Sequence, residues 1–149
     1  MGSWRDIEQA APAIALAGQR LLEDATGRPD AAFLATVNRD GLPRVHPFVP
    51  AIVDGALYAF IMSSPKRQDL DRTGAYAIHS FLGAEDESFF VSGHARRVND
   101  EHAWATVAAH MPYDDVDEQH GLYEFGVERA LWTTWTTPSS PVYRHWPEG

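Results

Sequence analysis

The chain has 149 residues, no cysteine and a formal net charge of −9 at pH 7. The absence of cysteine excludes disulfides and thiolate-based catalytic, zinc or iron–sulfur sites, and the negative charge disfavours nucleic acid and anionic membranes as partners. Because no apolar run approaches the length of a membrane span and the N-terminus has no signal pattern, we expect one soluble, cytoplasmic domain over residues 1–149.

The N-terminal segment, residues 1–28, is expected to be helical. Apolar residues such as Ile7, Ile14 and Leu21 recur there at helical spacing. Pro12 cannot lie inside a regular helix, so we expect a kink or two short helices, the second starting near Pro12. This segment is expected to lie across the rest of the domain as a lid.

Residues 33–70 are expected to form three short strands and a helix. Phe33, Ala35 and Val37 alternate with Leu34, Thr36 and Asn38, which is the period of two expected of a half-buried strand. The next strand contains Pro47 and Pro50, and proline cannot donate a hydrogen bond to a sheet, so it should be an edge or bulged strand. The third strand covers 56–62. Asp-Gly pairs mark the turns between these strands.

The helix that follows is expected to start at Ser64. Ser64 is a good N-cap, and Pro65 is favoured at the first helical position. Lys66 and Arg67 then lie in the first turn, where the helix dipole disfavours cations. A bound anion such as phosphate would explain this arrangement. The alternative is that both side chains are simply solvated surface residues.

The second half of the chain is expected to be mainly β. Strands are predicted over 75–82 and 88–98, with a bulge or close backbone approach at Gly93. A helix is predicted over 101–110, capped by Asn99 or Asp100. The many Thr, Trp, Tyr and Val residues within 129–146 favour two further strands there.

About seven strands and two or three helices follow from this reading. Short connections make the strands mostly antiparallel, which fits a closed, mainly β barrel decorated with helices. Two acidic segments, 85–87 and 114–118, are expected to be loops. The histidines have no metal-ligand spacing, so no metal site is predicted.

Three sequence segments appear in an order that resembles a known family. They are AFLATVNRDGLPRVHP (32–47), SSPKRQDL (63–70) and VSGHARRV (91–98). Together they resemble the FMN-binding split barrel of the pyridoxamine-phosphate-oxidase-like family over roughly residues 30–100. The chain departs from the family at Asp69, where asparagine is common.

The resemblance implies that FMN binds in a groove between the two barrels of a homodimer. Lys66, with Ser63 and Ser64, would hold the phosphate. Arg44, Val45 and His46 would line the isoalloxazine ring, with Arg44 near its pyrimidine end. Further contacts would come from Arg67 and Gln68 of the same subunit and from Trp135 or Arg144 of the partner.

The function implied is an FMN-dependent oxidoreductase that acts on a small organic substrate, with no catalytic side chain assigned. Two alternatives stay open: a deazaflavin-dependent reductase of the same fold, and a module that binds flavin or haem without turnover. The C-terminal sequence PVYRHWPEG lacks the R-L-H-D-R motif of true pyridoxamine phosphate oxidases. A phosphorylated substrate is therefore not expected.

Overall fold

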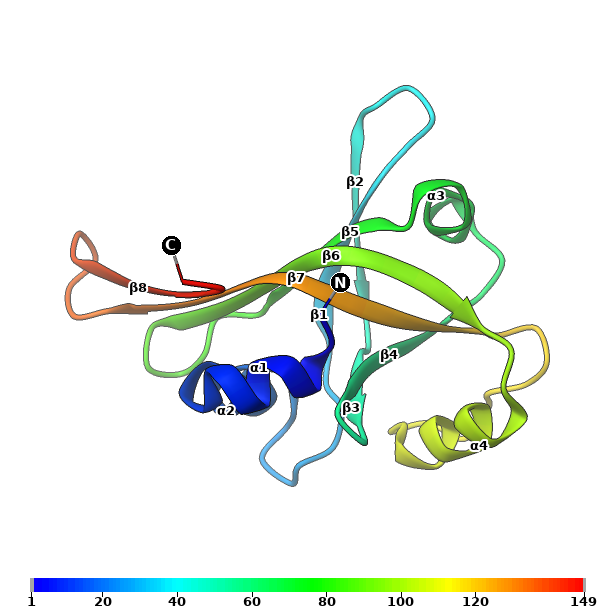
Figure 1. The fold of residues 1–149 in the computed structure, drawn as a ribbon, viewed down its shortest axis with the longest axis horizontal. Coiled ribbons are helices and arrows are strands. Elements are labelled where there is room, and N and C mark those ends of the chain that lie inside the picture. Colours follow the sequence, from blue (N-terminus) through cyan, green and yellow to red (C-terminus); the bar gives the residue numbers. More distant parts are fainter. Residues whose placement is uncertain (1, 149) are drawn as a thin grey trace.

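The computed structural model describes residues 2–148. These residues form one eight-stranded antiparallel sheet, and four helices pack around it (Figure 1). The elements are α1 (Trp4–Ala10), α2 (Pro12–Leu22), β1 (Ala32–Val37), β2 (Pro43–Phe48), β3 (Ala51–Val53), β4 (Ala56–Ile61), α3 (Pro65–Thr73), β5 (Ala75–Ser80), β6 (Glu87–Val98), α4 (Glu101–His110), β7 (Gly121–Trp135) and β8 (Pro141–Trp146).

The sheet closes on itself where the chain passes from β2 to β3. Its strand order is β2-β1-β5-β6-β7-β4-β3, with β8 paired to β7. The two ends of this order, β2 and β3, are joined by only Val49 and Pro50. The strand predicted to be bulged is therefore broken into two pieces, which accounts for the eighth strand. The prediction of a mainly β, antiparallel split barrel is confirmed.

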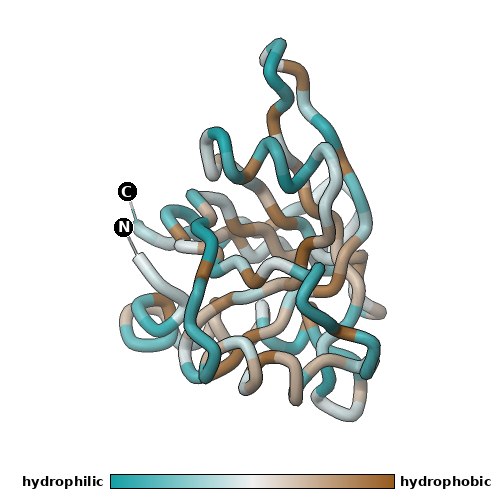
Figure 2. Tube along the Cα trace, turned by 90° about the vertical axis from the view of Figure 1, so that its right-hand side faces the viewer, coloured by the Kyte–Doolittle hydropathy of each residue, from teal (hydrophilic) through white to brown (hydrophobic). Residues whose placement is uncertain are grey.

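The N-terminal helices form part of the main hydrophobic core. They separate at Pro12, which is the first residue of α2, as its fixed φ requires. Trp4 and Ile7 of α1 are fully buried. The Trp4 ring packs edge-on against Phe89 of β6, with 5.7 Å between the two ring centres. Figure 2 shows the most hydrophobic segments concentrated inside the barrel. No helix within residues 2–148 has the length and apolar character needed to cross a membrane.

Strand β7 begins earlier than the sequence predicted. We expected strands only from residue 129, but β7 starts at Gly121 and runs for 15 residues. Its first part pairs with β4, and its last part pairs with β8. Tyr123, Phe125 and Val127 are fully buried and alternate with Glu124 and Gly126, which are not. The sequence therefore carried the period-two pattern of a half-buried strand here, and the expected start at residue 129 was wrong.

A second, smaller core lies under α4. Val107 of the helix packs with Met111 and with buried side chains of β3, β4 and β7. Asp100 caps the helix by accepting hydrogen bonds from the backbone N–H groups of His102 and Ala103, at 2.9 and 3.1 Å. Helix α4 thus covers the sheet beside β3, and the segment after it returns towards the start of α3.

Gly93 lies at the bulge that the sequence predicted. The pairing of β6 with β7 shifts register between Ser92 and Gly93. A Cβ atom at Gly93 would lie 2.2 Å from the carbonyl oxygen of Gly126. Two backbones therefore approach each other closely at this point, and only glycine leaves room for them.

Replacing Gly93 by alanine should destabilise the fold. Because the clashing atom is backbone, the two central strands must separate, and overpacking of this kind typically costs about 1–3 kcal/mol. Urea denaturation would measure the loss, with Ser92→Ala as the control in the same bulge. A Gly93→Ala variant as stable as Ser92→Ala would contradict this explanation of the bulge.

Candidate functional site

The start of α3 has the geometry that the sequence predicted. Ser64 is the N-cap, its hydroxyl oxygen accepts the backbone N–H of Arg67 at 3.4 Å, and Pro65 is the first helical residue. The same hydroxyl donates to the carbonyl oxygen of Met62 at 2.9 Å. Ser64 is therefore used in capping, while the neighbouring Ser63 is exposed.

Lys66 in the first turn of α3 is the single lysine of the chain. It is half-buried and takes part in none of the ion pairs formed within residues 2–148. A cation at a helix N-terminus without a carboxylate partner is electrostatically unfavourable. An anion bound beside it would remove that penalty.

Lys66 also lines a groove of about 500 Å³. One wall is apolar and comes from the end of β2 and from β4, with Phe48, Phe60 and Met62 as its largest members. The groove therefore combines an apolar surface with one free cation, a combination common in sites for organic anions.

The opposite wall of the groove comes from the segment after α4, which the sequence analysis did not assign to the site. Tyr113, Asp115 and His120 contribute to it. The His120 ring packs edge-on against Phe60, with 6.5 Å between the ring centres. The backbone carbonyl of His120 accepts a hydrogen bond from the indole N–H of Trp104 at 3.4 Å. The one sequence signal was the presence of Tyr113 next to an acidic run.

Strand β2 presents its three candidate residues to two different faces of the sheet. Arg44 and His46 pair in register with the buried residues Thr36 and Leu34, so they lie on the inner face. Val45 lies on the outer face and is 61% exposed. The Nε2 atom of His46 is buried and has no hydrogen-bond partner within residues 2–148.

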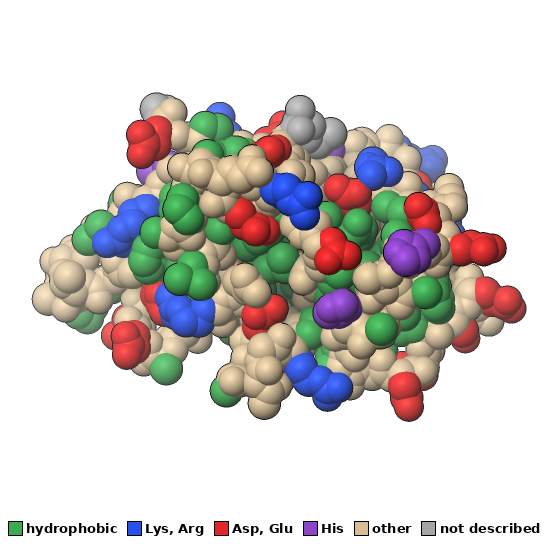
Figure 3. Space-filling view, turned by 60° about the horizontal axis from the view of Figure 1, so that its bottom comes forward, with side chains coloured by type: hydrophobic (Ala, Val, Ile, Leu, Met, Phe, Trp, Pro, Cys, Tyr) green, Lys and Arg blue, Asp and Glu red, His purple; other side chains and the backbone are tan. Residues whose placement is uncertain are grey.

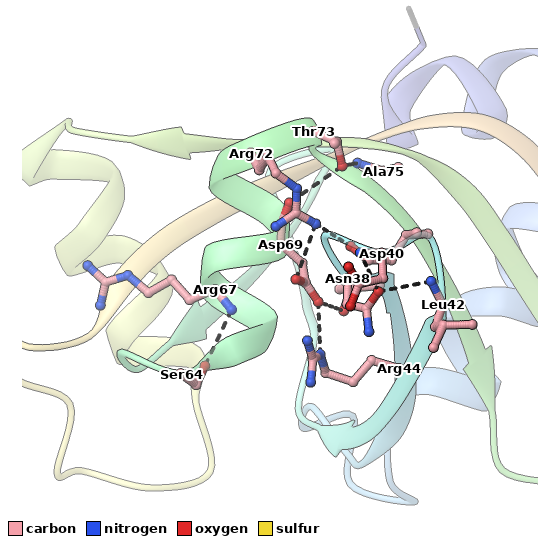
Figure 4. Close-up of polar contacts among 12 residues, drawn as sticks. Asn38, Asp40, Leu42, Arg44, Ser64, Arg67, Asp69, Arg72, Thr73 and Ala75 are labelled. Carbon is pink, nitrogen blue, oxygen red and sulfur yellow. Dashed lines mark hydrogen bonds and ion pairs between the residues drawn. The ribbon is translucent and has the colours of Figure 1, made fainter.

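Asp69 joins α3 to the β1–β2 hairpin. Its carboxylate accepts hydrogen bonds from Thr36 Oγ1 at 2.7 Å, Arg44 Nε at 2.9 Å and Arg72 Nη2 at 3.3 Å (Figure 4). Burial alone would raise the pKa of Asp69, but the hydrogen bonds from Arg44 and Thr36 outweigh it and hold that pKa below its usual value. Asp69 is thus a buried, charged partner of Arg44.

The Arg67 side chain is directed away from the side of α3 that meets Arg44. The Arg67 guanidinium points away from Asp69 (Figure 4) and donates to the carbonyl oxygen of Gln119 at 3.1 Å. This bond ties α3 to the segment that forms the second wall of the groove. Gln68 is exposed. Their assignment as flavin contacts stays a prediction.

Trp135 and Arg144 lie far from Lys66 within one chain. They belong to the β7–β8 arm, which extends away from α3 in Figure 1. The Arg144 guanidinium stacks 4.6 Å from the centre of the Trp132 ring and donates to Thr134 Oγ1 at 3.1 Å. A role for Trp135 or Arg144 at the groove therefore requires a second subunit.

A larger hollow of about 900 Å³ lies elsewhere, between α2, the segment after β5 and the start of β6. We expected Glu87 to belong to an acidic loop, but it is the first residue of β6 and is buried. Both of its oxygens are bound by the Arg20 guanidinium, and Oε2 also accepts the Trp132 indole N–H at 2.9 Å. Its charge is therefore satisfied within the chain.

Comparison with known proteins rests on structure alone, because no family model and no curated protein sequence matches this chain. A heme-binding protein from Mycobacterium smegmatis aligns with a TM-score of 0.63 and 16% identity over 86% of this chain. The alignment covers 57% of the mycobacterial protein, so this chain spans little more than half of its length.

Two clostridial structures give a similar result over most of their length. A Clostridium acetobutylicum protein of the pyridoxinephosphate oxidase family, related to general stress protein 26 of Bacillus subtilis, aligns with a TM-score of 0.61 and 9% identity over 94% of both chains. A NimC/NimA family protein from the same species has a TM-score of 0.59 and 16% identity, over 77% of this chain and 84% of its own. The fold is that of the pyridoxamine-phosphate-oxidase-like split barrels.

The groove of this split barrel fits the chemistry of FMN. Lys66, Ser63 and the N-terminal turn of α3 offer a cation and hydrogen-bond donors for a phosphate. Phe48, Phe60 and Met62 offer an apolar surface for a flat ring. Asp115 is the one carboxylate among the groove-lining residues.

The stabilisation that Glu87 provides should depend on pH. Its hydrogen bond from Arg20, opposed by burial and assisted by Trp132, lowers the pKa of Glu87 in the folded protein. A lowered carboxyl pKa stabilises the fold above the unfolded value of about 4.3, and that contribution is lost as the pH falls through the folded pKa. Glu87→Gln should therefore lower the free energy of unfolding by about 1–2 kcal/mol near neutral pH and by less in acid.

Urea denaturation of the wild type and Glu87→Gln between about pH 6 and pH 3 measures this difference. The exposed neighbour Glu85 supplies the control variant, Glu85→Gln. A stability difference between wild type and Glu87→Gln that stays constant across the range would mean that the Glu87 carboxylate does not titrate as described.

Proposed function

We propose that the chain is an FMN-binding oxidoreductase that holds the flavin phosphate at the start of α3. The observation that carries this proposal is the position of the single lysine. Lys66 lies unpaired in the first helical turn, beside an apolar groove, in a split-barrel fold. The structural neighbours support the fold, and the residues of the groove support the cofactor.

In this proposal each part of the flavin meets a different element. The Lys66 ammonium and the Ser63 hydroxyl hold the phosphate, while Ser64 keeps the first turn of α3 in place by capping it. The ring lies along β2, where Arg44 offers positive charge and the backbone of Val45 and His46 offers polar groups. A positive charge near the pyrimidine end of the ring would stabilise the negative charge of reduced flavin.

The bound flavin would carry the redox chemistry, accepting or donating a hydride. The chain itself contributes position and charge, and its charges restrict the substrate. Figure 3 shows acidic side chains spread over one face of the molecule. In the groove itself the carboxylate of Asp115 would repel a second phosphate, so the substrate is a small organic molecule that is uncharged or cationic. The chain would differ in this respect from true pyridoxamine phosphate oxidases, whose substrate carries a phosphate.

The residues that line the groove also bear on the two alternative cofactors, deazaflavin and haem. A deazaflavin with a long anionic tail would need a basic groove, whereas this groove is lined by one lysine and one carboxylate, Asp115. Haem would need an accessible imidazole nitrogen. Nε2 of His46 is buried, but His120 hydrogen-bonds Asp117 through Nδ1 and keeps Nε2 for a ligand. The apolar groove beside Lys66 favours FMN, and the absorption spectrum separates FMN from haem.

Replacing Lys66 by alanine should weaken FMN binding about tenfold to hundredfold. The variant loses a charge-assisted contact to phosphate, and such contacts contribute about 1.5–3 kcal/mol. Titration of the apo-protein with FMN, followed by the quenching of flavin fluorescence, measures the affinity. The absorption spectrum of the loaded protein distinguishes FMN from deazaflavin and haem.

Arg28→Ala is the matched control, since it removes one positive charge from an exposed loop before β1. The affinity of Arg28→Ala for FMN should equal that of the wild type. Equal affinities for the wild type and Lys66→Ala would refute the phosphate site, and a wild type that binds no FMN would refute the proposed cofactor.

We also propose that two copies of the chain assemble around the outer face of β1, β2 and β5. Phe33, Val37 and Val45 are exposed on this face, at 41%, 39% and 61%. Phe81, just after β5, is 46% exposed and its ring lies 4.7 Å from that of Phe33. Contiguous exposed apolar side chains are typical of interaction surfaces, and a two-fold dimer would place each of them twice in one interface.

Phe33→Glu should convert the dimer into a monomer at micromolar concentration. A two-fold interface would bring the introduced charges into the same buried patch, where they are unpaired. Light scattering measures the mass. Leu16→Glu, on the exposed side of α2, introduces the same charge at a residue that is 68% exposed and should leave the dimer intact. A wild type that is monomeric while FMN is bound would overturn this proposal.

A further inference from the structure

The carboxylate of Asp69 lies between two arginines that reach it from different elements. Arg44 comes from β2 and Arg72 from the last turn of α3 (Figure 4). The Asp69 side chain is only 3% exposed, while that of Arg44 is 32% exposed. Asp69 is therefore shielded from any ligand, whereas part of the Arg44 side chain stays exposed.

The contact with Asp69 uses only one of the Arg44 nitrogens. Nε donates to Asp69 Oδ2 at 2.9 Å, while the two Nη groups form no hydrogen bond with any group in residues 2–148. An arginine side chain has several rotatable bonds, so a fixed Nε restricts the direction in which the Nη groups point. Thr36, at 2.7 Å from the same carboxylate, fixes Asp69 in turn.

Lys66 and Asp69 are three residues apart on α3, so they lie on the same side of the helix. Arg44 lies on the inner face of β2, opposite this side of α3. The contact with Asp69 thereby holds Arg44 beside α3, about one helical turn along from Lys66.

We propose that Asp69 is a positioning residue, which holds Arg44 in the orientation that binds the flavin. The inference rests on the proposed FMN site and adds to it a role for Asp69. Asp69 acts only through Arg44 and does not itself touch the cofactor. Because the pair is buried on one side, its geometry is defined before the ligand binds, which lowers the entropy lost on binding.

A double-mutant cycle on FMN affinity tests this role. Arg44→Ala and Asp69→Ala should each weaken binding about tenfold, as expected for the loss of a charge-assisted contact. The double variant should bind no more weakly than either single variant, within about twofold, because both changes remove the same interaction. Asp69→Asn should recover affinity to within about threefold of the wild type, since its amide oxygen still accepts the Arg44 Nε–H.

Two further variants keep the test decisive. Asp71→Asn changes a carboxylate on the same helix whose partner is Tyr123, and it should bind FMN as the wild type does. Where Asp69→Ala does not fold, Asp69→Ser replaces it in the cycle, because serine retains a polar group for Thr36 but is too short to hold Arg44.

Three results would overturn the role of Asp69: wild-type affinity in Asp69→Ala, losses that multiply in the double variant, or an Asp69→Asn variant as weak as Asp69→Ala. Each presupposes that the wild type binds FMN and that Lys66→Ala weakens it. A failure of the FMN site itself is therefore seen first, in the wild type and in Lys66→Ala, and is distinguishable from a failure of this inference.

Discussion

The interruption of one strand at Val49 and Pro50 is the constraint on which the rest of the molecule depends. Pro50 has no N–H to donate, and pairing stops at Val49 and Pro50, although Pro43 and Pro47 keep their register with β1 inside β2. The chain turns there, and β2 and β3 become the two ends of a single sheet that closes into a barrel. Because β2 pairs only with β1, its end is available to line a groove instead of joining another strand.

The closure of the barrel also explains why the groove has two walls of different character. The wall from β2 and β4 belongs to the sheet and is apolar, as a sheet face next to a core should be. The wall formed after α4 is a connection between elements, and connections tolerate charged residues. Asp115 and His120 therefore face Lys66 across an apolar surface. In the proposed function the sheet would supply affinity for a flat ring, and the connection would supply the charges that restrict what else can bind.

Features that depend on neighbouring residues could be predicted from the sequence. The start of α3 follows from Ser64 and Pro65 alone, and the bulge at Gly93 follows from a glycine inside a strand pattern. Features that depend on distant residues could not. Nothing in the sequence pairs Arg44 with Asp69, or brings Tyr113 to the groove, because these contacts exist only once the barrel has closed. The start of β7 belongs to the first group, because Tyr123, Phe125 and Val127 alternate with Glu124 and Gly126, a local pattern that the expected start at residue 129 left out.

The basic residues of the chain are distributed unevenly between structural pairs and the groove. A chain with a net charge of −9 has one lysine and eleven arginines. Several of these arginines, among them Arg20, Arg44 and Arg96, are already paired with carboxylates within the fold. Arginine suits such pairs because its planar group makes several directed hydrogen bonds, whereas lysine is a compact point charge suited to phosphate. The single lysine lies unpaired at a helix N-terminus, where a structural role would be unfavourable. It takes part in no ion pair within residues 2–148, and the anion proposed to bind there would account for its position.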